Sequence, residues 1–205
     1  EIPSDKRIMV CFGGGSAKKN GVYEQVKNAL SNHFNIEFWG IEPNPDYDTV
    51  MKAVTLAHDN KINYLVAVGG GSVIDGTKFI AHAIPYTGED AWELAIHPEK
   101  ITKTTPLATV LTLPATGSEM NYRGVLSRRR TQEKVSFITP KSSPQFSILD
   151  PEVTYTLPEI CYSRSGSYIY PSHETTDQRR CRFFYAYHGT VHDYYGKRYF
   201  DGPMG

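Results

Sequence analysis

The chain has 205 residues, a mass of 23.0 kDa and 22 basic against 22 acidic side chains, so its formal net charge is zero. This balance gives no overall attraction to nucleic acid or to an anionic membrane. No apolar run approaches membrane-spanning length, and the three cysteines form no C-x-x-C pair. We therefore expect a soluble cytoplasmic protein without a nucleic-acid or membrane partner.

Apolar strands alternate with amphipathic helices over residues 1–158. Strands are predicted at residues 7–12, 36–39, 64–68 and 107–113, and helices at 22–30, 50–57 and 72–82. Such alternation, with nearly all-apolar strands, indicates an α/β fold in which helices cover both faces of a parallel sheet. Farther along, residues 124–127 and 134–137 are predicted to pair as a hairpin.

Two of these strands end in the same tetrapeptide, Gly-Gly-Gly-Ser. The first glycine turn (residues 13–16) consists of Gly13, Gly14, Gly15 and Ser16, and the second (residues 69–72) ends in Gly70, Gly71 and Ser72. Glycine lets the backbone approach a phosphate, and the N–H groups of the following helix then face the anion. One such run can serve a tight turn alone. Two runs, each at the carboxyl end of a strand, favour a dinucleotide site.

A third loop (residues 112–119) follows the fourth strand and reads TLPATGSE. Its threonines and backbone amides can hold a pyrophosphate or a nicotinamide. The alternative is a polar turn in which a serine or threonine caps the next element. Taken alone, the loop favours that alternative.

Four motifs, "EPNP", "VGGGSVID", "TLPATGSE" and "DPEVTYTLP", together resemble the iron-dependent, group III alcohol dehydrogenases. The resemblance is closest to the NADPH-dependent aldehyde reductases and butanol dehydrogenases, and it covers residues 1–158. It implies a dinucleotide-binding domain there, which in the family precedes a helical domain holding a divalent metal, iron or zinc. Members interconvert alcohols and aldehydes by hydride transfer, and intact members are homodimers.

The resemblance also assigns roles to single residues. Gly70, Gly71 and Ser72 would bind the pyrophosphate, Asp75 would help to fix the cofactor, Thr112 and Thr116 would line the nicotinamide side, and Lys134 would reach the ribose. Two of these have plain alternatives. Asp75 can be an acid favoured by the helix dipole, and Lys134 can be a solvated hairpin lysine.

The first glycine turn bears on the choice of cofactor. NAD-preferring relatives place an acid where Gly13 stands, and such an acid would repel a 2′-phosphate. This turn has no acid, and Ser16, Lys18 and Lys19 lie close by. The resemblance therefore favours NADP(H) over NAD(H), although the two lysines can equally be a solvated helix start.

The composition changes near residue 159. Residues 159–205 contain no leucine but hold eight of the chain's 14 tyrosines. The family pattern expected there, R-Q-x-x-N-G-x-x-D-x-x-x-H-x-x-E-Q-Y, is not visible, although its Asp and His ligate the metal. His188 and His192 are four apart, as ligands on a helix would be, but they do not fall where the family's ligands would. No metal ligand and no catalytic residue is assigned, and the helical metal domain is expected to be absent.

The genetic code offers an explanation for this change. One nucleotide along, codons from Ser165 onward permit "PEVTYTLPTRQLTNGVADSFMHTMEQYM", with an Asp across Arg182 and Phe183 and a His across Ala186 and Tyr187. We therefore hypothesise that residues 159–205 are a largely frame-shifted, poorly ordered tail. A tyrosine- and arginine-rich segment that contacts RNA or serves assembly is the competing interpretation, which the neutral charge and the hidden frame both oppose.

The sequence thus predicts the cofactor domain of an oxidoreductase that acts on small alcohols and aldehydes. The chain as written is expected to be inactive. The alternative from a different class is a nucleotide-binding module without catalysis.

Overall fold

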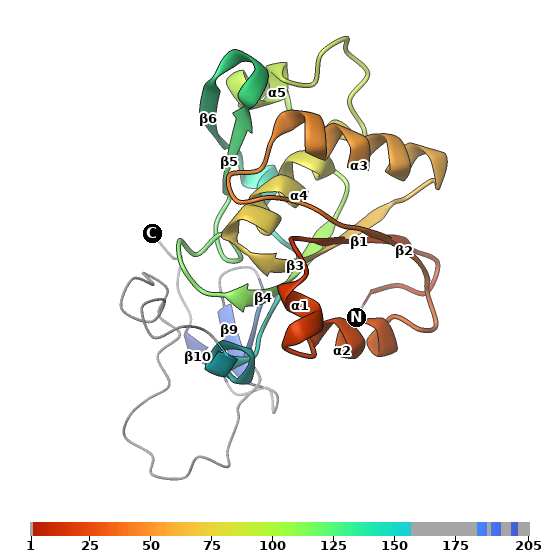
Figure 1. Cartoon of the computed structure of the whole chain (residues 1–205), viewed down its shortest axis with the longest axis vertical. Coiled ribbons are helices and arrows are strands. Elements are labelled where there is room, and N and C mark those ends of the chain that lie inside the picture. The colour runs from red at the N-terminus through yellow and green to blue at the C-terminus, as the bar shows by residue number, and fades with distance from the viewer. Residues whose placement is uncertain (1, 157–183, 188–189, 194–197, 201–205) are drawn as a thin grey trace.

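The protein is described by a computed structural model that covers residues 2–156 and, as strand backbone only, residues 184–187, 190–193 and 198–200 (Figure 1). The strands are β1 Arg7–Phe12, β2 Phe34–Phe38, β3 Tyr64–Gly70, β4 Leu107–Leu113, β5 Arg123–Arg128, β6 Glu133–Ile138, β7 Ser147–Leu149, β8 Phe184–Tyr187, β9 Thr190–Asp193 and β10 Arg198–Phe200. The α-helices are α1 Ser16–Lys19, α2 Val22–Ala29, α3 Tyr47–Asp59, α4 Gly71–Ala83 and α5 Glu93–Ile96. The 3-10 helices are η1 Pro98–Lys100, η2 Arg129–Thr131, η3 Pro140–Ser142 and η4 Pro151–Thr156.

The main sheet is parallel through the order β7-β4-β3-β1-β2. From β1 the chain moves outward to β2, then returns to the other side of β1 for β3 and continues to β4. The direction of winding therefore reverses between β1 and β3, and such a switch point opens a crevice at the carboxyl ends of the strands. Beyond β7, the backbones of β8, β9 and β10 add antiparallel strands.

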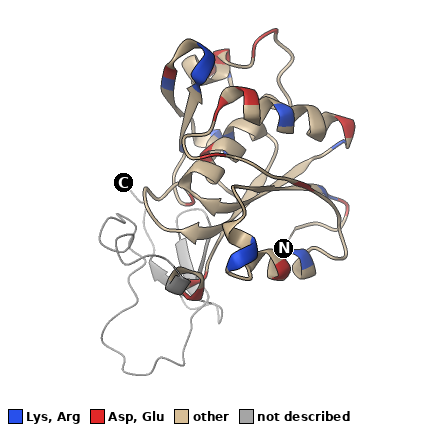
Figure 2. Cartoon of the chain, in the orientation of Figure 1, with Lys and Arg blue, Asp and Glu red and all other residues tan. Residues whose placement is uncertain are grey.

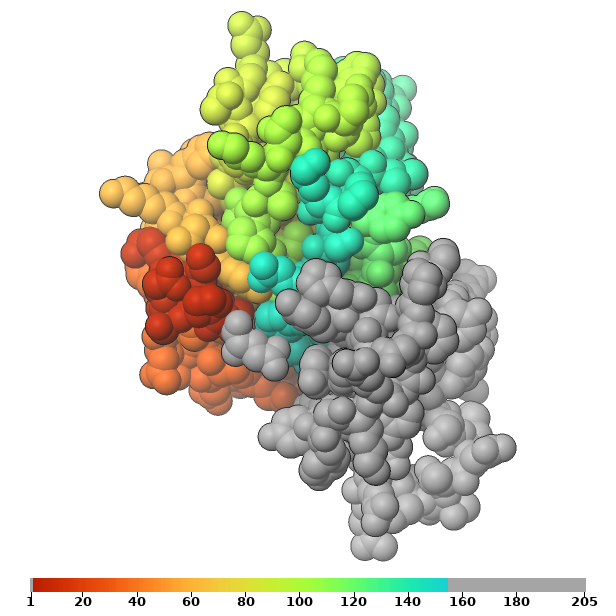
Figure 3. Space-filling model, turned by 180° about the vertical axis from the view of Figure 1, so that it is seen from behind, coloured from red at the N-terminus to blue at the C-terminus, as the bar shows by residue number. Residues whose placement is uncertain are grey.

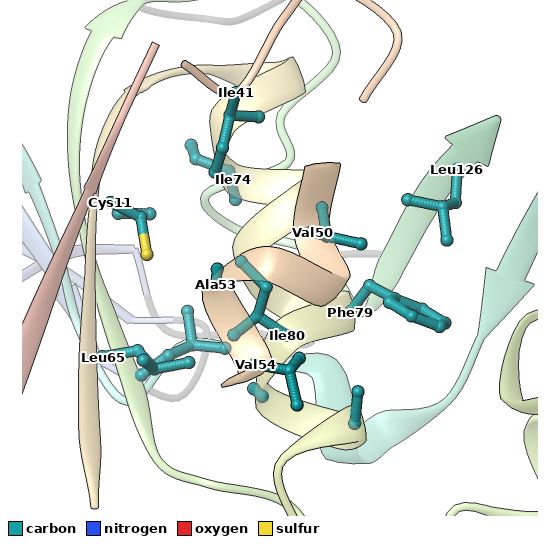
Figure 4. Close-up of a cluster of buried hydrophobic side chains, with 14 of the residues drawn as sticks. Cys11, Ile41, Val50, Ala53, Val54, Leu65, Ile74, Phe79, Ile80 and Leu126 are labelled. Carbon is teal, nitrogen blue, oxygen red and sulfur yellow. The ribbon is translucent and has the colours of Figure 1, made fainter. Parts of the chain in front are cut away.

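Alternating side chains of β1 divide the core between the two faces of the sheet. Met9 and Cys11 belong to the cluster under α3 and α4, part of which Figure 4 shows. Ile8, Val10 and Phe12 belong to the cluster under α1 and α2. This period of two is what a strand buried on both faces requires. Figure 1 shows α3 and α4 on one side of the sheet and α1 and α2 on the other.

Helix α4 is the central helix, and most of its residues are buried. A Cβ on Gly76 would lie 3.1 Å from Ile41 Cγ2 and 3.2 Å from Pro45 Cβ, so only a small residue fits without a shift of these neighbours. Helix α3 packs beside α4 and begins at the cap residue Asp46, whose side chain accepts the Asp48 N–H at 3.0 Å. Both helices therefore have fixed starting points near the carboxyl ends of the strands.

On the face opposite that of Figure 1, the segments that precede β4 and β7 lie side by side (Figure 3). The Gln145 N–H donates to Leu107 O at 2.8 Å there, and the parallel pairing of β4 with β7 follows. Within the described residues, no helix is both long enough and apolar enough to cross a membrane.

The predicted parallel sheet with helices on both faces is confirmed, and so is the hairpin, which is β5 with β6. Strand β7 has only three residues and was not predicted. His192 lies in strand β9 rather than on a helix, while His188 lies outside the described residues. The sequence predicts that residues 159–205 are frame-shifted and poorly ordered. Both statements stay predictions, because the structure describes only three strand backbones of this segment.

Candidate nucleotide-binding site

The two glycine turns meet at the switch point between β1 and β3. A Cβ on Gly13 would lie 3.2 Å from Val73 Cγ2, and a Cβ on Gly69 would lie 2.5 Å from the same atom. Both turns thus pack on Val73, in the first turn of α4. A side chain at Gly69 would displace the helix, so glycine there allows α4 to approach the strand ends.

The third loop reaches the start of α4 at Gly71. A Cβ on Gly71 would lie 3.4 Å from both Thr116 Oγ1 and Ser118 Oγ, and these two hydroxyls are 3.1 Å apart. The cap position of α4 is Gly70, which offers no side chain to the first N–H groups of the helix. Two hydroxyls therefore lie beside the start of α4, whose first N–H groups have no side-chain cap, and a methyl group on Gly71 would contact both hydroxyls. This donor set fits the pyrophosphate of a dinucleotide.

Ser72 and Lys134 are linked through Asn44. The Asn44 N–H donates to Ser72 Oγ at 3.3 Å, and Lys134 Nζ donates to Asn44 Oδ1 at 2.6 Å. Asn44 has a φ of 56°, a left-handed conformation that asparagine tolerates better than most residues. The hairpin thereby brings the exposed Lys134 to the rim of the second glycine turn, although it is 62 residues further along the chain than Ser72.

A polar stripe runs along one face of α4. It consists of Gly71, Asp75, Lys78 and His82, which recur at helical spacing and face the segment 116–142. Asp75 Oδ2 accepts the Val125 N–H at 3.0 Å. Its Oδ1 is buried and accepts no hydrogen bond of good geometry from the described residues. Burial raises the pKa of Asp75, while Lys78 and the nearby Ser118 hydroxyl oppose the shift.

Sequence reasoning missed Lys78, which is fully buried in this stripe. Its Nζ donates to Asn121 O at 2.8 Å, Asn121 Oδ1 at 3.1 Å and Arg123 O at 2.6 Å. Burial lowers its pKa to about 8, while Asp75 and Glu119 act in the opposite direction. The available signal was a lysine three residues after Asp75, on the face of α4 that carries the predicted site.

The carboxyl end of β1 carries an aromatic cluster. Phe12 stacks on Trp39 with ring centroids 4.1 Å apart, and Lys18 Nζ lies 4.3 Å from the Trp39 ring centroid. Ser16, the first residue of α1, is exposed, as is Gly14 beside Gly15, whose φ of 106° favours glycine. The first glycine turn therefore offers solvent an ammonium group and a hydroxyl.

Thr112 and Thr116 have different environments. Thr112 is buried in β4, whereas Thr116 is exposed in the third loop. The structure thus gathers Gly13, Gly69, Gly70, Gly71, Ser72, Thr116 and Lys134 around the start of α4. Thr112 is the next-to-last residue of β4, and Asp75 lies one turn further along α4.

The described residues give a divalent metal no ligand set, because no three His, Cys, Asp or Glu side chains gather among them. Basic and acidic residues are scattered over this part of the chain rather than separated by sign (Figure 2). Cys11 is buried and free, while Cys161 and Cys181 lie outside the described residues.

Comparisons with known proteins identify the family. The family model for iron-containing alcohol dehydrogenases matches residues 2–151. The chain belongs to the iron-containing alcohol dehydrogenases. It is 50% identical over 160 residues to the NADPH-dependent aldehyde reductase YqhD of Escherichia coli, a match that covers 77% of this chain and 41% of that protein. It is 42% identical over 156 residues to NADH-dependent butanol dehydrogenase A of Clostridium acetobutylicum, with 75% and 40% covered.

Solved structures of iron-containing alcohol dehydrogenases match the same part of the chain. The crystal structure of Escherichia coli YqhD gives a TM-score of 0.75 at 49% identity, over 77% of this chain and 41% of that one. The structure of NADH-dependent butanol dehydrogenase A from Thermotoga maritima gives 0.71 at 41% identity, over 75% and 39%. The chain thus spans about two fifths of the length of the iron-containing alcohol dehydrogenases it matches.

Proposed function

We propose that residues 1–158 form the dinucleotide-binding domain of an oxidoreductase that interconverts small alcohols and aldehydes with NADP(H). The observation that carries this proposal is the meeting of three loops at the start of α4. Gly13 and Gly69 pack on Val73, and Gly71 faces the hydroxyls of Thr116 and Ser118. A bound nicotinamide dinucleotide would supply the hydride. The chain's own groups would orient its pyrophosphate and ribose.

Two features support NADP(H) rather than NAD(H). The acid of β2, Glu37, has both oxygens engaged, because Tyr23 OH donates to Oε1 at 2.9 Å and Trp39 Nε1 donates to Oε2 at 2.7 Å. It is therefore not free to bind a ribose diol. Close by, the Lys18 ammonium lies over the Trp39 ring, where it can meet a 2′-phosphate. The matched relatives include both NADPH- and NADH-dependent proteins, so the preference for NADP(H) is proposed from residues of this chain alone.

The metal-dependent step is outside what the described residues can perform. The family name implies iron, but those residues gather no ligand set for it. The second candidate is a nucleotide-binding module without catalysis. A dimer and a cytoplasmic location are parts of the proposal that rest on the family resemblance and on composition.

Two measurements on the 205-residue chain test the proposal. A fluorescence titration is expected to detect NADPH binding. An NADPH-oxidation assay with butanal is expected to show no turnover, even with added Fe²⁺ or Zn²⁺. Absence of NADPH binding would contradict the nucleotide site, and metal-dependent turnover would contradict the expected inactivity.

The frame-shift hypothesis for residues 159–205 remains a separate proposal. It is supported by the family-like string that the shifted codons permit. The gene's nucleotide sequence across codons 150–205 tests it. One unambiguous frame throughout, with no slip upstream, would contradict it.

A further inference from the structure

Lys78 is fully buried, and its ammonium group makes all its hydrogen bonds to one segment of the chain. All three of its acceptors, Asn121 O, Asn121 Oδ1 and Arg123 O, belong to the segment that joins the third loop to β5. An ammonium has three N–H donors, and here each meets an acceptor. The contact joins two parts of the chain that are more than 40 residues apart in sequence.

The same segment is held from its other side by β7. Ser147 Oγ donates to Glu119 O at 2.6 Å and accepts from Thr109 Oγ1 at 2.7 Å. Glu119 is itself buried, and Lys78 is the cation acting on its carboxyl group. Thr116 and Ser118 directly precede the two attachments, which are Ser147 to Glu119 and Lys78 to residues 121–123. The positions of the two hydroxyls beside Gly71 therefore depend on where the segment is held.

We propose that Lys78 is a positioning residue that fixes the segment 116–123 against α4 and so sets the Thr116 and Ser118 hydroxyls at Gly71 for the pyrophosphate. The inference rests on the proposed function for its link to nucleotide, but the anchoring itself can be measured without nucleotide. Lys78 has no contact with the expected ligand. It acts through the segment that it holds.

Hydrogen–deuterium exchange on the nucleotide-free protein tests the anchor. Lys78→Met keeps an unbranched side chain of similar length but removes the donor to Asn121 O and Arg123 O, while Asn121 Oδ1 still accepts the Arg123 N–H at 2.9 Å. We expect amides of residues 116–123 to exchange at least about tenfold faster, while β1 and β3 change much less. The control is Ile80→Val, which trims a buried apolar residue of α4 and lowers stability but leaves the Lys78 hydrogen bonds in place. Equal exchange of residues 116–123 in both variants would overturn the proposal.

NADPH titration of the same proteins tests the link to binding. Lys78→Met is expected to raise the dissociation constant for NADPH about tenfold over that of Ile80→Val. Lys78→Gln, whose side-chain amide keeps part of the N–H donor set, should give a smaller change in the same direction and serves if Lys78→Met does not fold. Faster exchange with unchanged NADPH affinity would overturn the positioning role. If the unmodified chain bound no NADPH, the proposed function would fail, whereas the exchange result would still decide whether the anchor exists.

Discussion

At the scale of single residues, the site depends on where side chains are missing as much as on where they are present. A Cβ at Gly69 would overlap Val73, and one at Gly71 would enter the space beside Thr116 and Ser118. These positions were recognisable because a glycine run after an apolar strand has a physical reason. Lys78 was missed although it lies three residues after Asp75, because a lysine in a helix is normally exposed and only the fold shows its burial.

The Lys18 and Lys19 pair gives a matched test of cofactor preference. Lys18 lies over the Trp39 ring, whereas its exposed neighbour Lys19 carries the same charge one residue away. Lys18→Gln is expected to raise the NADPH dissociation constant about tenfold, or about 1.4 kcal/mol, because one contact with the 2′-phosphate is lost. NADH binding should change much less, and Lys19→Gln should affect NADPH less than Lys18→Gln does. Equal losses for NADPH and NADH in Lys18→Gln would contradict a phosphate contact.

His82 predicts an acid-sensitive contribution to stability. Burial, with Lys78 and Lys141 adding to it, lowers the pKa of His82 from 6.5 to about 3, and the ring Nε2 lies 2.7 Å from Ser142 Oγ. Between these two pKa values the unfolded chain binds a proton that the folded chain does not. Stability is therefore lost as the pH falls through this window, by at most about 1.4 kcal/mol per pH unit from this group.

His82→Gln isolates that contribution, because Asp75 and Glu119 titrate in both proteins. Urea unfolding at pH 7 and pH 5 is the measurement. The unmodified chain should lose more free energy of unfolding between these two pH values than His82→Gln does. The same loss in both proteins would show that His82 does not carry the effect.

At the scale of elements, α4 and the β5–β6 hairpin form the unit that supports the third loop. The polar stripe of α4 faces the segment 116–142 along its whole length, while its other residues pack into the core. Burying the Lys78 ammonium costs several kcal/mol, and three charge-assisted hydrogen bonds of about 1.5–3 kcal/mol each offset that cost. The pairing of hairpin with helix therefore depends on a complete set of partners.

Gly124 tests the fit between hairpin and helix. A Cβ there would lie 2.3 Å from Phe137 Cζ, and the Phe137 ring is fully buried, with its centroid 5.9 Å from that of Phe79. Gly124→Ala is expected to lower the free energy of unfolding by about 1–3 kcal/mol, because the ring must move within a packed core. Gly14→Ala is the control, since a Cβ at Gly14 meets nothing within 4 Å. Equal unfolding free energies for the two variants, measured in urea, would contradict this packing.

At the scale of the whole molecule, the sequence predicted a parallel sheet with helices on both faces but not the full width of that sheet. Apolar runs and glycine turns indicated β1, β3 and β4, because buried parallel strands are long and continuous. Strand β7 has three residues, too few for a period of two to be visible. The hairpin of β5 and β6 also separates it in sequence from β4, the parallel strand with which it pairs. The stripe on α4 was likewise hidden, because its partners lie more than 40 residues away and become neighbours only in the fold.

The most direct test of the nucleotide site is NADPH titration of Gly71→Ala. The added methyl group would lie 3.4 Å from Thr116 Oγ1 and Ser118 Oγ, in the space assigned to the pyrophosphate. Alanine is also favoured over glycine in a helix, so the melting temperature should not fall. The account predicts an NADPH dissociation constant raised at least about tenfold, with no change for Lys52→Ala on the exposed side of α3. Unchanged NADPH affinity in a folded Gly71→Ala would contradict a dinucleotide site at the start of α4.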